Sequence, residues 1–209
     1  MEMEKKEKTA VAEKRGDLVV RFKRPYVFEG ECYDEVDLSG LEDMTIQDAV
    51  DVQGQLSDGT EVAAMMVTEL SHAFARALAA RAAGKPIEFF QLLPMGAAKK
   101  VTNAVRGFLN GAAAEQHVVK LERPYHFAGR EYTEVDLSGV EELTSMHISR
   151  AENQLVRAGF VVTENSFNYL YACIVAGMAA QLPTEFFTGL PLADLLKIKN
   201  AVNDASFFE

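Results

Sequence analysis

Two stretches of the chain repeat each other: residues 19–45, VVRFKRPYVFEGECYDEVDLSGLEDMT, and residues 118–144, VVKLERPYHFAGREYTEVDLSGVEELT. Without a gap, 16 of their 27 positions are identical. The similarity resumes where KPIEFFQLLPMGAAKKVTNAV at residues 85–105 matches LPTEFFTGLPLADLLKIKNAV at residues 182–202. Solenoid repeats are only about 20–50 residues long and need several neighbours. A repeat of this length therefore predicts a duplicated domain.

The repeat divides the 209 residues into segments. We expect a charged leader at residues 1–16, a first domain at residues 17–109, a linker at residues 110–116 and a second domain at residues 117–209. A single core usually holds about 100–150 residues, so this length suits two small domains. The offset between the copies falls from 99 to 97 residues between Leu56 and Phe89, so the second copy is two residues shorter there.

Each copy begins with a pattern typical of a β-hairpin. Its two strands are rich in Val, Phe, Leu and Tyr or alternate in polarity, and they cover residues 18–27 and 33–38 in the first copy and residues 117–125 and 132–137 in the second. Gly30 and Gly129 lie between the strands and permit the positive φ of a tight connection. Pro25 and Pro124 remove a backbone donor, so we expect the first strand at an edge.

After each hairpin the apolar period changes to that of a helix. We expect a first amphipathic helix after Thr45 or Thr144, a second at residues 62–82 or 166–180, and a last one after Pro94 or Pro191. The second helix is apolar almost all round, which predicts the buried centre of each domain. The predicted fold class is α+β and mostly helical, with two homologous domains that each have an N-terminal β-hairpin followed by about three helices.

Charge and hydropathy narrow the possible partners. The formal net charge of −10 is shared evenly between the two halves, and the only basic cluster in the sequence lies in residues 5–15. Phosphate backbones bind clustered Lys and Arg, so we expect no nucleic-acid partner. No apolar run reaches the roughly 18 residues of a membrane span, and the leader lacks the apolar core of a signal peptide. We therefore expect a cytoplasmic protein with no membrane partner.

The sequence indicates no enzyme, metal or cofactor. Cys32 and Cys173 lie at unrelated places in the two copies, and none of the four histidines has a histidine equivalent. Metal sites need Cys, His or carboxylates at ligand spacing, and common catalytic motifs such as the P-loop, G-x-S-x-G and H-E-x-x-H are missing from the sequence. Two carboxylate pairs share a strand face, either as a chemical pair or as the polar face of a hairpin: Glu35 with Asp37, and Glu134 with Asp136.

Two features are candidates for partner binding. The first is a pair of adjacent aromatic residues in each copy, Phe89 and Phe90 in the first and Phe186 and Phe187 in the second. They either anchor a partner at the surface, as aromatic residues often do, or fill the core beneath the last helix. The second is the free edge of each hairpin, which either accepts a strand from another chain or is protected.

The string R-P-Y-x-F-x-G-x-x-Y-x-E-V-D-L-S-G, followed by a polar helix, an apolar helix, L-P-T-E-F-F-x-G-L-P and a last helix ending in K-N-A-V, resembles the small tail assembly chaperone family of long-tailed phages and prophages. The second copy carries this pattern from end to end, at Pro124, Gly129, Leu137, Thr144, Pro183, Phe186, Gly189, Leu190 and Pro191. The first copy departs from it at Leu92 and in its last helix. Family members usually have one such domain, so the tandem is a departure.

The resemblance implies a non-enzymatic protein of the bacterial host cytoplasm. It would coat the helical, aggregation-prone tape measure protein until the tail tube polymerises around it, and would contact other tail assembly proteins. Such families often add a C-terminal extension by ribosomal frameshifting. The alternative function is that of a structural neck or tail-completion protein retained in the virion. We expect the two domains to bind apolar helical segments of the tape measure protein through equivalent surfaces, and the short linker gives an effective concentration of about millimolar for the second site.

Overall fold

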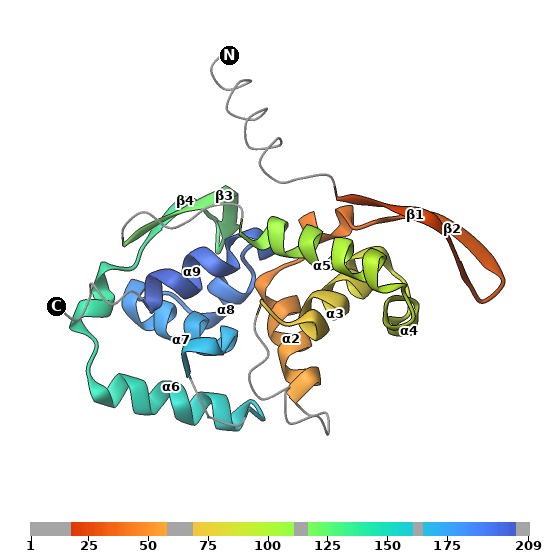
Figure 1. Ribbon diagram of the computed structural model, residues 1–209. Coiled ribbons are helices and arrows are strands. Elements are labelled where there is room, and N and C mark those ends of the chain that lie inside the picture. Colours follow the sequence, from red (N-terminus) through yellow and green to blue (C-terminus); the bar gives the residue numbers. More distant parts are fainter. Residues whose placement is uncertain (1–17, 58–68, 111–116, 161–164, 204–209) are drawn as a thin grey trace, which may run out of the picture. The chain divides into compact units, whose positions relative to one another are not determined.

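A computed structural model of the chain describes residues 18–57, 69–110, 117–160 and 165–203. These residues form an α+β structure in which two antiparallel β-hairpins are each followed by helices (Figure 1), as the sequence predicts. The first repeat forms β1 (Val19–Phe28), β2 (Glu31–Asp37), the 3₁₀-helix η1 (Ser39–Glu42), α2 (Ile46–Ser57), α3 (His72–Ala83), α4 (Ile87–Gln91) and α5 (Met95–Leu109). The second forms β3 (Val118–Phe127), β4 (Arg130–Asp136), η3 (Ser138–Glu142), α6 (Ser145–Arg157), η4 (Asn165–Phe167), α7 (Tyr169–Ala180), α8 (Thr184–Thr188), η5 (Leu192–Asp194) and α9 (Leu195–Val202).

Most elements of the two repeats correspond in order and nearly in length, whereas the single helix α5 corresponds to η5 and α9 of the second repeat. β1 and β3 begin 99 residues apart, as do α2 and α6, whereas α3 and α7 begin 97 residues apart and so do α4 and α8. The two-residue shortening therefore falls between the first and the second α-helix of each repeat. Any residue of one repeat can be assigned its counterpart in the other by these two offsets.

The compact units of the structure do not coincide with the repeats. Unit 1 comprises Met1–Asp43 and Glu69–Gly111, and unit 2 comprises Met44–Thr68 and Ala112–Glu209. The predicted domains, residues 17–109 and 117–209, differ from these units in one helix, because α2 belongs to unit 2. There it packs against α7, α8 and η5, and its apolar face is buried at Ile46, Ala49, Val50 and Val52.

Both hairpins have the geometry that their turn residues favour. Glu29 and Gly30 have φ values of 50° and 84°, and Ala128 and Gly129 have values of 48° and 78°. Two consecutive positive φ angles are typical of a type I′ turn, whose twist matches that of the strands. The ladder of β1 and β2 is irregular between Arg21 and Tyr26, and that of β3 and β4 between Lys120 and Tyr125. These irregular segments contain Pro25 and Pro124, which have no N–H for the ladder.

The Ser-Gly pair after each hairpin brings η1 and η3 against the following helices. A Cβ atom on Gly40 would lie 2.2 Å from Ala82 O, and one on Gly139 would lie 2.3 Å from Ala179 O. Only glycine permits such an approach between two backbones. This contact explains why both repeats keep the Leu-Ser-Gly sequence.

The second helix of each repeat begins later than predicted. α3 begins at His72, ten residues after the predicted start, because the Ser71 side chain accepts hydrogen bonds from the first turn and caps the helix. Part of the predicted helix, residues 62–68, lies outside the described residues. α7 begins at Tyr169, where the Asn168 side chain accepts from Tyr171 N over 2.9 Å. α7 is buried along most of its length, as predicted, whereas α3 exposes Arg81.

The predicted leader and linker cannot be compared with the structure, whereas the prediction of no membrane span can be compared for the described residues. The predicted leader at residues 1–16 lies outside the described residues, as does nearly all of the predicted linker at residues 110–116. Among the residues that are described, no helix has the length and apolar character needed to cross a membrane.

Candidate interaction surfaces

The phenylalanine pairs lie in the cores of the two units. Phe89 and Phe186 are completely buried, as is Phe187, and Phe90 is 3% exposed. A partner cannot reach them without opening the core, so their placement fits the packing alternative. No structural feature tests partner binding by them directly, and it stays a prediction.

Each of the two buried rings Phe89 and Phe186 connects a hairpin to its helices. Phe89 makes edge-to-face contacts with three aromatic rings of the first hairpin, at centroid distances of 5.1, 5.4 and 5.0 Å, from Tyr26, Phe28 and Tyr33. Phe186 repeats the arrangement at 5.3, 5.4 and 4.8 Å, with Tyr125, Phe127 and Tyr132. Such pairs contribute about 0.5–1.5 kcal/mol each beyond the area they bury. The aromatic positions of the repeated motif therefore have a structural role in both units.

The hydroxyl group of the first-strand tyrosine in each aromatic cluster lies close to the helical segment beside it. Tyr26 donates its hydroxyl hydrogen to Phe89 O over 3.0 Å. A Cβ atom on Gly189 would lie 2.3 Å from the hydroxyl oxygen of Tyr125. Burial raises the pKa of Tyr26 and of Tyr125 above the ordinary value. Gly189 thus leaves room for the hydroxyl group of Tyr125.

The strand carboxylates act in turns and ion pairs. Asp37 accepts a hydrogen bond from Ser39 N over 2.8 Å, and Asp136 accepts one from Ser138 N over 2.9 Å. These backbone hydrogen bonds lower the pKa of both aspartates. Glu35 pairs with Arg21 across the strands at 3.2 Å. The two members of the first carboxylate pair thus have separate partners, which fits the interpretation of a polar hairpin face.

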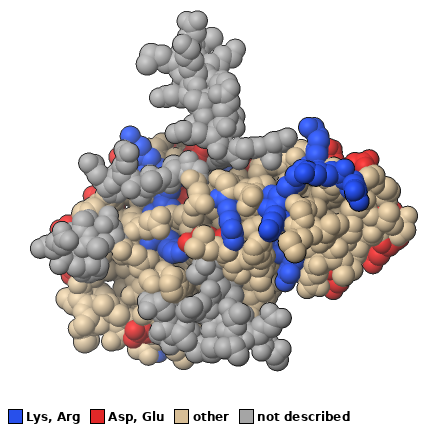
Figure 2. Space-filling view, viewed as in Figure 1, with Lys and Arg blue, Asp and Glu red and all other residues tan. Residues whose placement is uncertain are grey.

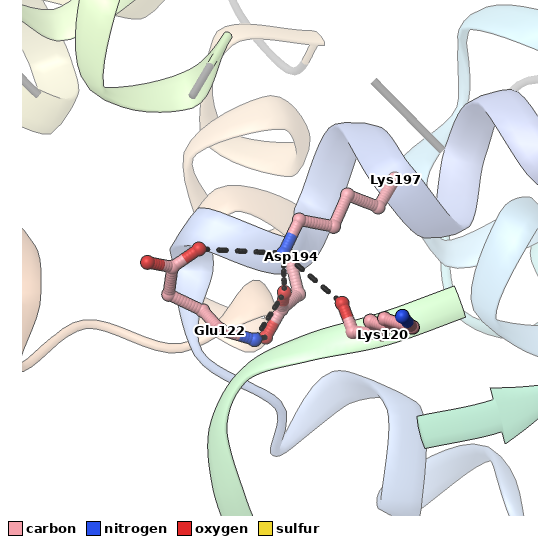
Figure 3. Close-up of polar contacts among 4 residues, drawn as sticks. All are labelled: Lys120, Glu122, Asp194 and Lys197. Atoms are coloured by element: carbon pink, nitrogen blue, oxygen red, sulfur yellow. Dashed lines mark hydrogen bonds and ion pairs between the residues drawn. The ribbon is translucent and has the colours of Figure 1, made fainter. Parts of the chain in front are cut away.

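Unit 2 contains a buried ionic cluster, drawn in Figure 3. Asp194 is fully buried and Lys197 is 6% exposed. Lys197 Nζ lies 2.7 Å from Asp194 Oδ1 and 3.3 Å from Glu122 Oε2, and it donates to Lys120 O over 3.1 Å. Glu122 N donates to the Asp194 carboxylate over 3.0 Å. Burial raises the pKa of Asp194 above its ordinary value, against the opposing effect of Lys197.

This cluster fixes the irregular part of β3 to α9. The lysine and the glutamate come from a helix and a strand that are far apart in the sequence, so periodicity did not reveal them. Unit 1 keeps one part of the arrangement, since Lys100, the counterpart of Lys197, donates to Arg21 O over 2.8 Å. Ala97 stands at the position of Asp194. The lysine that satisfies a strand carbonyl is therefore the common feature of the two units.

Unit 1 has a basic patch that the sequence did not predict. Figure 2 shows lysine and arginine side chains gathered on one face over β1 and α5. Five exposed cations form this basic patch, namely Arg21, Lys23 and Arg24 of β1 and Lys99 and Lys100 of α5. The two groups are about 75 residues apart and meet because α5 packs on β1. The sequence gives one indication of this patch when the repeats are compared. The second repeat has Glu122 and Leu196 where the first has Lys23 and Lys99.

The segment after the Phe-Phe pair is exposed in unit 1 and buried in unit 2. In unit 1, Leu92 is 68% exposed and Met95 is 73% exposed. In unit 2 the counterpart of Met95 is Leu192, which is fully buried and whose N–H donates to Met44 O over 2.9 Å. The difference arises because α2 lies on η5 and α8 of unit 2. We call the corresponding face of unit 1, formed by α3, α4 and Pro94–Met95, the open helix site.

α6 packs against α7 of its own unit and buries few of its side chains. Of its thirteen residues only Ala151 and Leu155 are fully buried, whereas Met146 is 64% exposed and Val156 is 61% exposed. A cavity of about 170 Å³ lies beside α6, and apolar side chains make up most of its wall: Val140, Leu143, Ile148, Tyr171, Val175 and Val202, together with His147 and Asn203. Among the described residues, this apolar cavity and the open helix site both offer apolar side chains to an amphipathic helix.

The histidines and cysteines have local roles. His72 lies 3.0 Å from the Thr102 hydroxyl, and His126 lies 2.9 Å from Glu131. His147 Nδ1 accepts from Thr144 N over 3.0 Å. Burial raises the pKa of Cys173 to about 12. Within the described ranges, three or more His, Cys, Asp or Glu side chains do not come together as metal ligands would.

Comparisons of the chain with protein-family models, with curated protein sequences and with solved structures gave no match.

Proposed function

We propose that the chain is a tail assembly chaperone of a long-tailed phage or prophage, which binds the tape measure protein and keeps it soluble before the tail tube polymerises. The observation that carries the proposal is the framework repeated in the two units. R-P-Y-x-F-x-G-x-x-Y-x-E-V-D-L-S-G forms the hairpin and the approach at Gly40 or Gly139, and E-F-F forms the helix that fills the aromatic cluster. The sequence pattern that resembles the family is therefore the pattern that builds the fold.

Such a chaperone would act by covering the apolar stripes on the helices of the tape measure protein. A tape measure chain exposes these stripes before assembly, and exposed apolar patches lead to aggregation. An amphipathic helix binds by placing its apolar face in an apolar groove. The cavity of about 170 Å³ beside α6 has room for a side chain of such a helix, because the apolar residues Ile148, Tyr171 and Val175 line it. The formal charge of −10 would keep the complex dispersed.

Co-expression with the tape measure protein of the same phage tests the proposal. We expect the tape measure protein to become soluble and to co-purify with the full chain. Ile148→Asp, which places a charge in the cavity wall, should reduce the soluble fraction severalfold. Val156→Asp is the matched control, because Val156 is exposed on the same helix and does not line the cavity. An insoluble tape measure protein with the wild-type chain, or equal effects of the two substitutions, would contradict the proposal.

The alternative is a structural neck or tail-completion protein that remains in the particle. The two functions differ in where the protein is found after assembly. Mass spectrometry of purified virions should detect no copies of a chaperone and a fixed number of copies of a structural protein.

A further inference from the structure

The apolar cavity of unit 2 lies beside the end of its last helix. Its wall comes from η3, α6 and α7 and, on the remaining side, from Val202 and Asn203. α9 ends at Val202, so the chain leaves the helix at the cavity wall. Ile148 is 47% exposed, and Asn203 is exposed as well. These two residues therefore mark the mouth of the cavity, and the segment that follows α9 starts there.

Four residues of the cavity wall are less completely buried than their counterparts in unit 1. In unit 2 they are between 4% and 9% exposed, namely Val140, Tyr171, Val175 and Val202. Their counterparts in unit 1 are 0% exposed, namely Leu41, Phe74, Leu78 and Val105. Leucine stands in unit 1 where unit 2 has Val140 and Val175, so two of the positions also have smaller side chains in unit 2. The same framework is therefore packed more completely in unit 1.

The last helix of unit 1 supplies two large apolar side chains at its end. α5 packs against α3 and continues past Val105. It buries Phe108 and Leu109, which are 2% and 1% exposed. α9 ends at the counterpart of Val105, and the residues that correspond to Phe108 and Leu109 are Ala205 and Ser206. Unit 2 thus has small side chains at the two positions where unit 1 buries large ones.

Two aromatic residues, Phe207 and Phe208, follow these small residues directly. They belong to residues 204–209, which lie outside the described residues. Phe207 is four residues from Asn203, and a connection of that length reaches at most about 14 Å. Its ring can therefore return to the mouth of the cavity. An apolar cavity of about 150 Å³ binds benzene, so the cavity of about 170 Å³ in unit 2 has room for one phenyl ring.

We propose that the apolar cavity is a binding site for an aromatic side chain, and that Phe207 of the chain's own C-terminal segment occupies it in the absence of a partner. The ring replaces the apolar surface that Phe108 and Leu109 supply at the end of α5 in unit 1. Phe207 is the nearer of the two aromatic residues to the cavity. In an extended segment neighbouring side chains point to opposite sides, so Phe208 points away from it.

Occupation by Phe207 also sets the chemistry of a partner at this cavity, and this part rests on the proposed function. A helix of the tape measure protein that presents an aromatic residue on its apolar stripe fills the same space after it displaces Phe207. The apparent affinity for such a helix falls by the fraction of chains whose cavity is open. The chain's own segment would thus favour partners whose side chain fills the cavity well.

A cavity-filling substitution tests the occupation in the chain alone. Val175→Leu introduces the leucine that unit 1 has at Leu78 and adds volume to the cavity wall. In a Phe207→Ala chain it should raise the midpoint of urea denaturation, because it fills empty space. In the wild-type chain it should lower the midpoint, because the ring of Phe207 already fills the space and overpacking destabilises a core.

Phe208→Ala is the matched control for this comparison. In a Phe208→Ala chain, Val175→Leu should lower the midpoint as it does in the wild type, because Phe207 is still present. The same change of midpoint in the wild-type and Phe207→Ala chains would show that Phe207 does not occupy the cavity, and would overturn the proposal.

Disulfide cross-linking tests where the C-terminal segment lies. In a Cys32→Ser background, Ser206→Cys and Ile148→Cys place thiols beside Phe207 and at the mouth of the cavity. We expect them to form a disulfide within one chain on oxidation, at a rate that falls severalfold when Phe207→Ala is added. Phe208→Ala should leave the rate unchanged. A rate that does not depend on Phe207 would show that its ring does not hold the segment at the cavity, and would contradict the proposal.

Titration of apolar helical segments of the tape measure protein tests the competition. The Phe207→Ala chain should bind segments with an aromatic residue on the apolar stripe severalfold more tightly than the wild type, and the Phe208→Ala chain should bind them as the wild type does. Equal affinities of the wild-type and Phe207→Ala chains would overturn the competition. Segments that bind none of the three chains would refute the proposed function, whereas the denaturation and cross-linking results decide the occupation by Phe207 on their own.

Discussion

At the scale of single residues, the repeated motif is explained by contacts that tolerate no other side chain. Gly40 approaches the carbonyl of Ala82, and Gly139 approaches the carbonyl of Ala179. In both cases the group that would meet a Cβ is fixed by the surrounding structure. Most of the glycines with open space around them, such as Gly96 and Gly107, fall outside the repeated motif.

Substitution of Gly139 tests this explanation. Gly139→Ala would place a Cβ 2.3 Å from Ala179 O, so η3 or α7 must shift, and we expect the free energy of unfolding to fall by about 2–3 kcal/mol. Gly107→Ala is the matched control in α5, where nothing lies within 4 Å. It should raise the free energy by about 0.5–1 kcal/mol, because alanine favours a helix. Urea denaturation measures both, and similar changes in the two variants would contradict the account.

The aspartates that hold the turns predict a pH dependence. The hydrogen bond from Ser138 N lowers the pKa of Asp136 below its ordinary value of 3.8. The folded state therefore favours the ionised form, and this contribution is present above pH 3.8 and is lost as the pH falls through the folded-state pKa. Asp136→Asn should be less stable than the wild type at pH 6, and the difference should be smaller at about pH 3 in denaturation experiments. A difference that is the same at both pH values would contradict the assignment, and Glu134→Gln controls for the loss of a charge on the same strand.

At the scale of elements, the packing of α2 on unit 2 explains why the two compact units differ from the two sequence repeats. Its apolar positions are buried on unit 2, and Gln53 joins it to the segment that precedes α7. A helix of the first repeat is therefore part of the core of the second unit. The hairpin and α3 of the first repeat remain in unit 1.

Loss of the Gln53 contacts should loosen unit 2. Gln53→Leu removes the hydrogen bonds to Phe167 O and Tyr169 N, and we expect it to destabilise the protein by about 2–4 kcal/mol. Gln55→Leu, two residues further on an exposed position of α2, should change the stability by less than about 0.5 kcal/mol. Hydrogen exchange should be faster in α7 of the first variant only. Equal exchange in both variants would show that α2 does not stabilise unit 2.

The sequence predicts the elements better than their partners. Local signals determine the hairpins, because the two-residue turns at Gly30 and Gly129 need positive φ, and the repeat presents these signals twice. The period of α2 indicates which face is buried and carries no information on which unit buries it. The start of α3 was predicted too early because an apolar run continues before Ser71. The basic patch and the cluster around Lys197 were missed because their residues meet only after folding.

At the scale of the whole molecule, the two units share a framework and differ on their surfaces. Unit 1 has the basic patch and the open helix site, whereas unit 2 has the buried ionic cluster and the cavity beside α6. A duplication that served only to double one binding site would preserve equal surfaces. We infer that the units have different roles, with unit 2 the better candidate for the tape measure protein.

Binding of the tape measure protein is the central claim, and calorimetric titration of its apolar helical segments into the full chain tests it most directly. We predict binding with a negative heat-capacity change, which is the signature of buried apolar surface. Segments of the same length whose apolar stripe is replaced by polar residues should not bind. No binding of the natural segments, or equal binding of the polar ones, would contradict the claim.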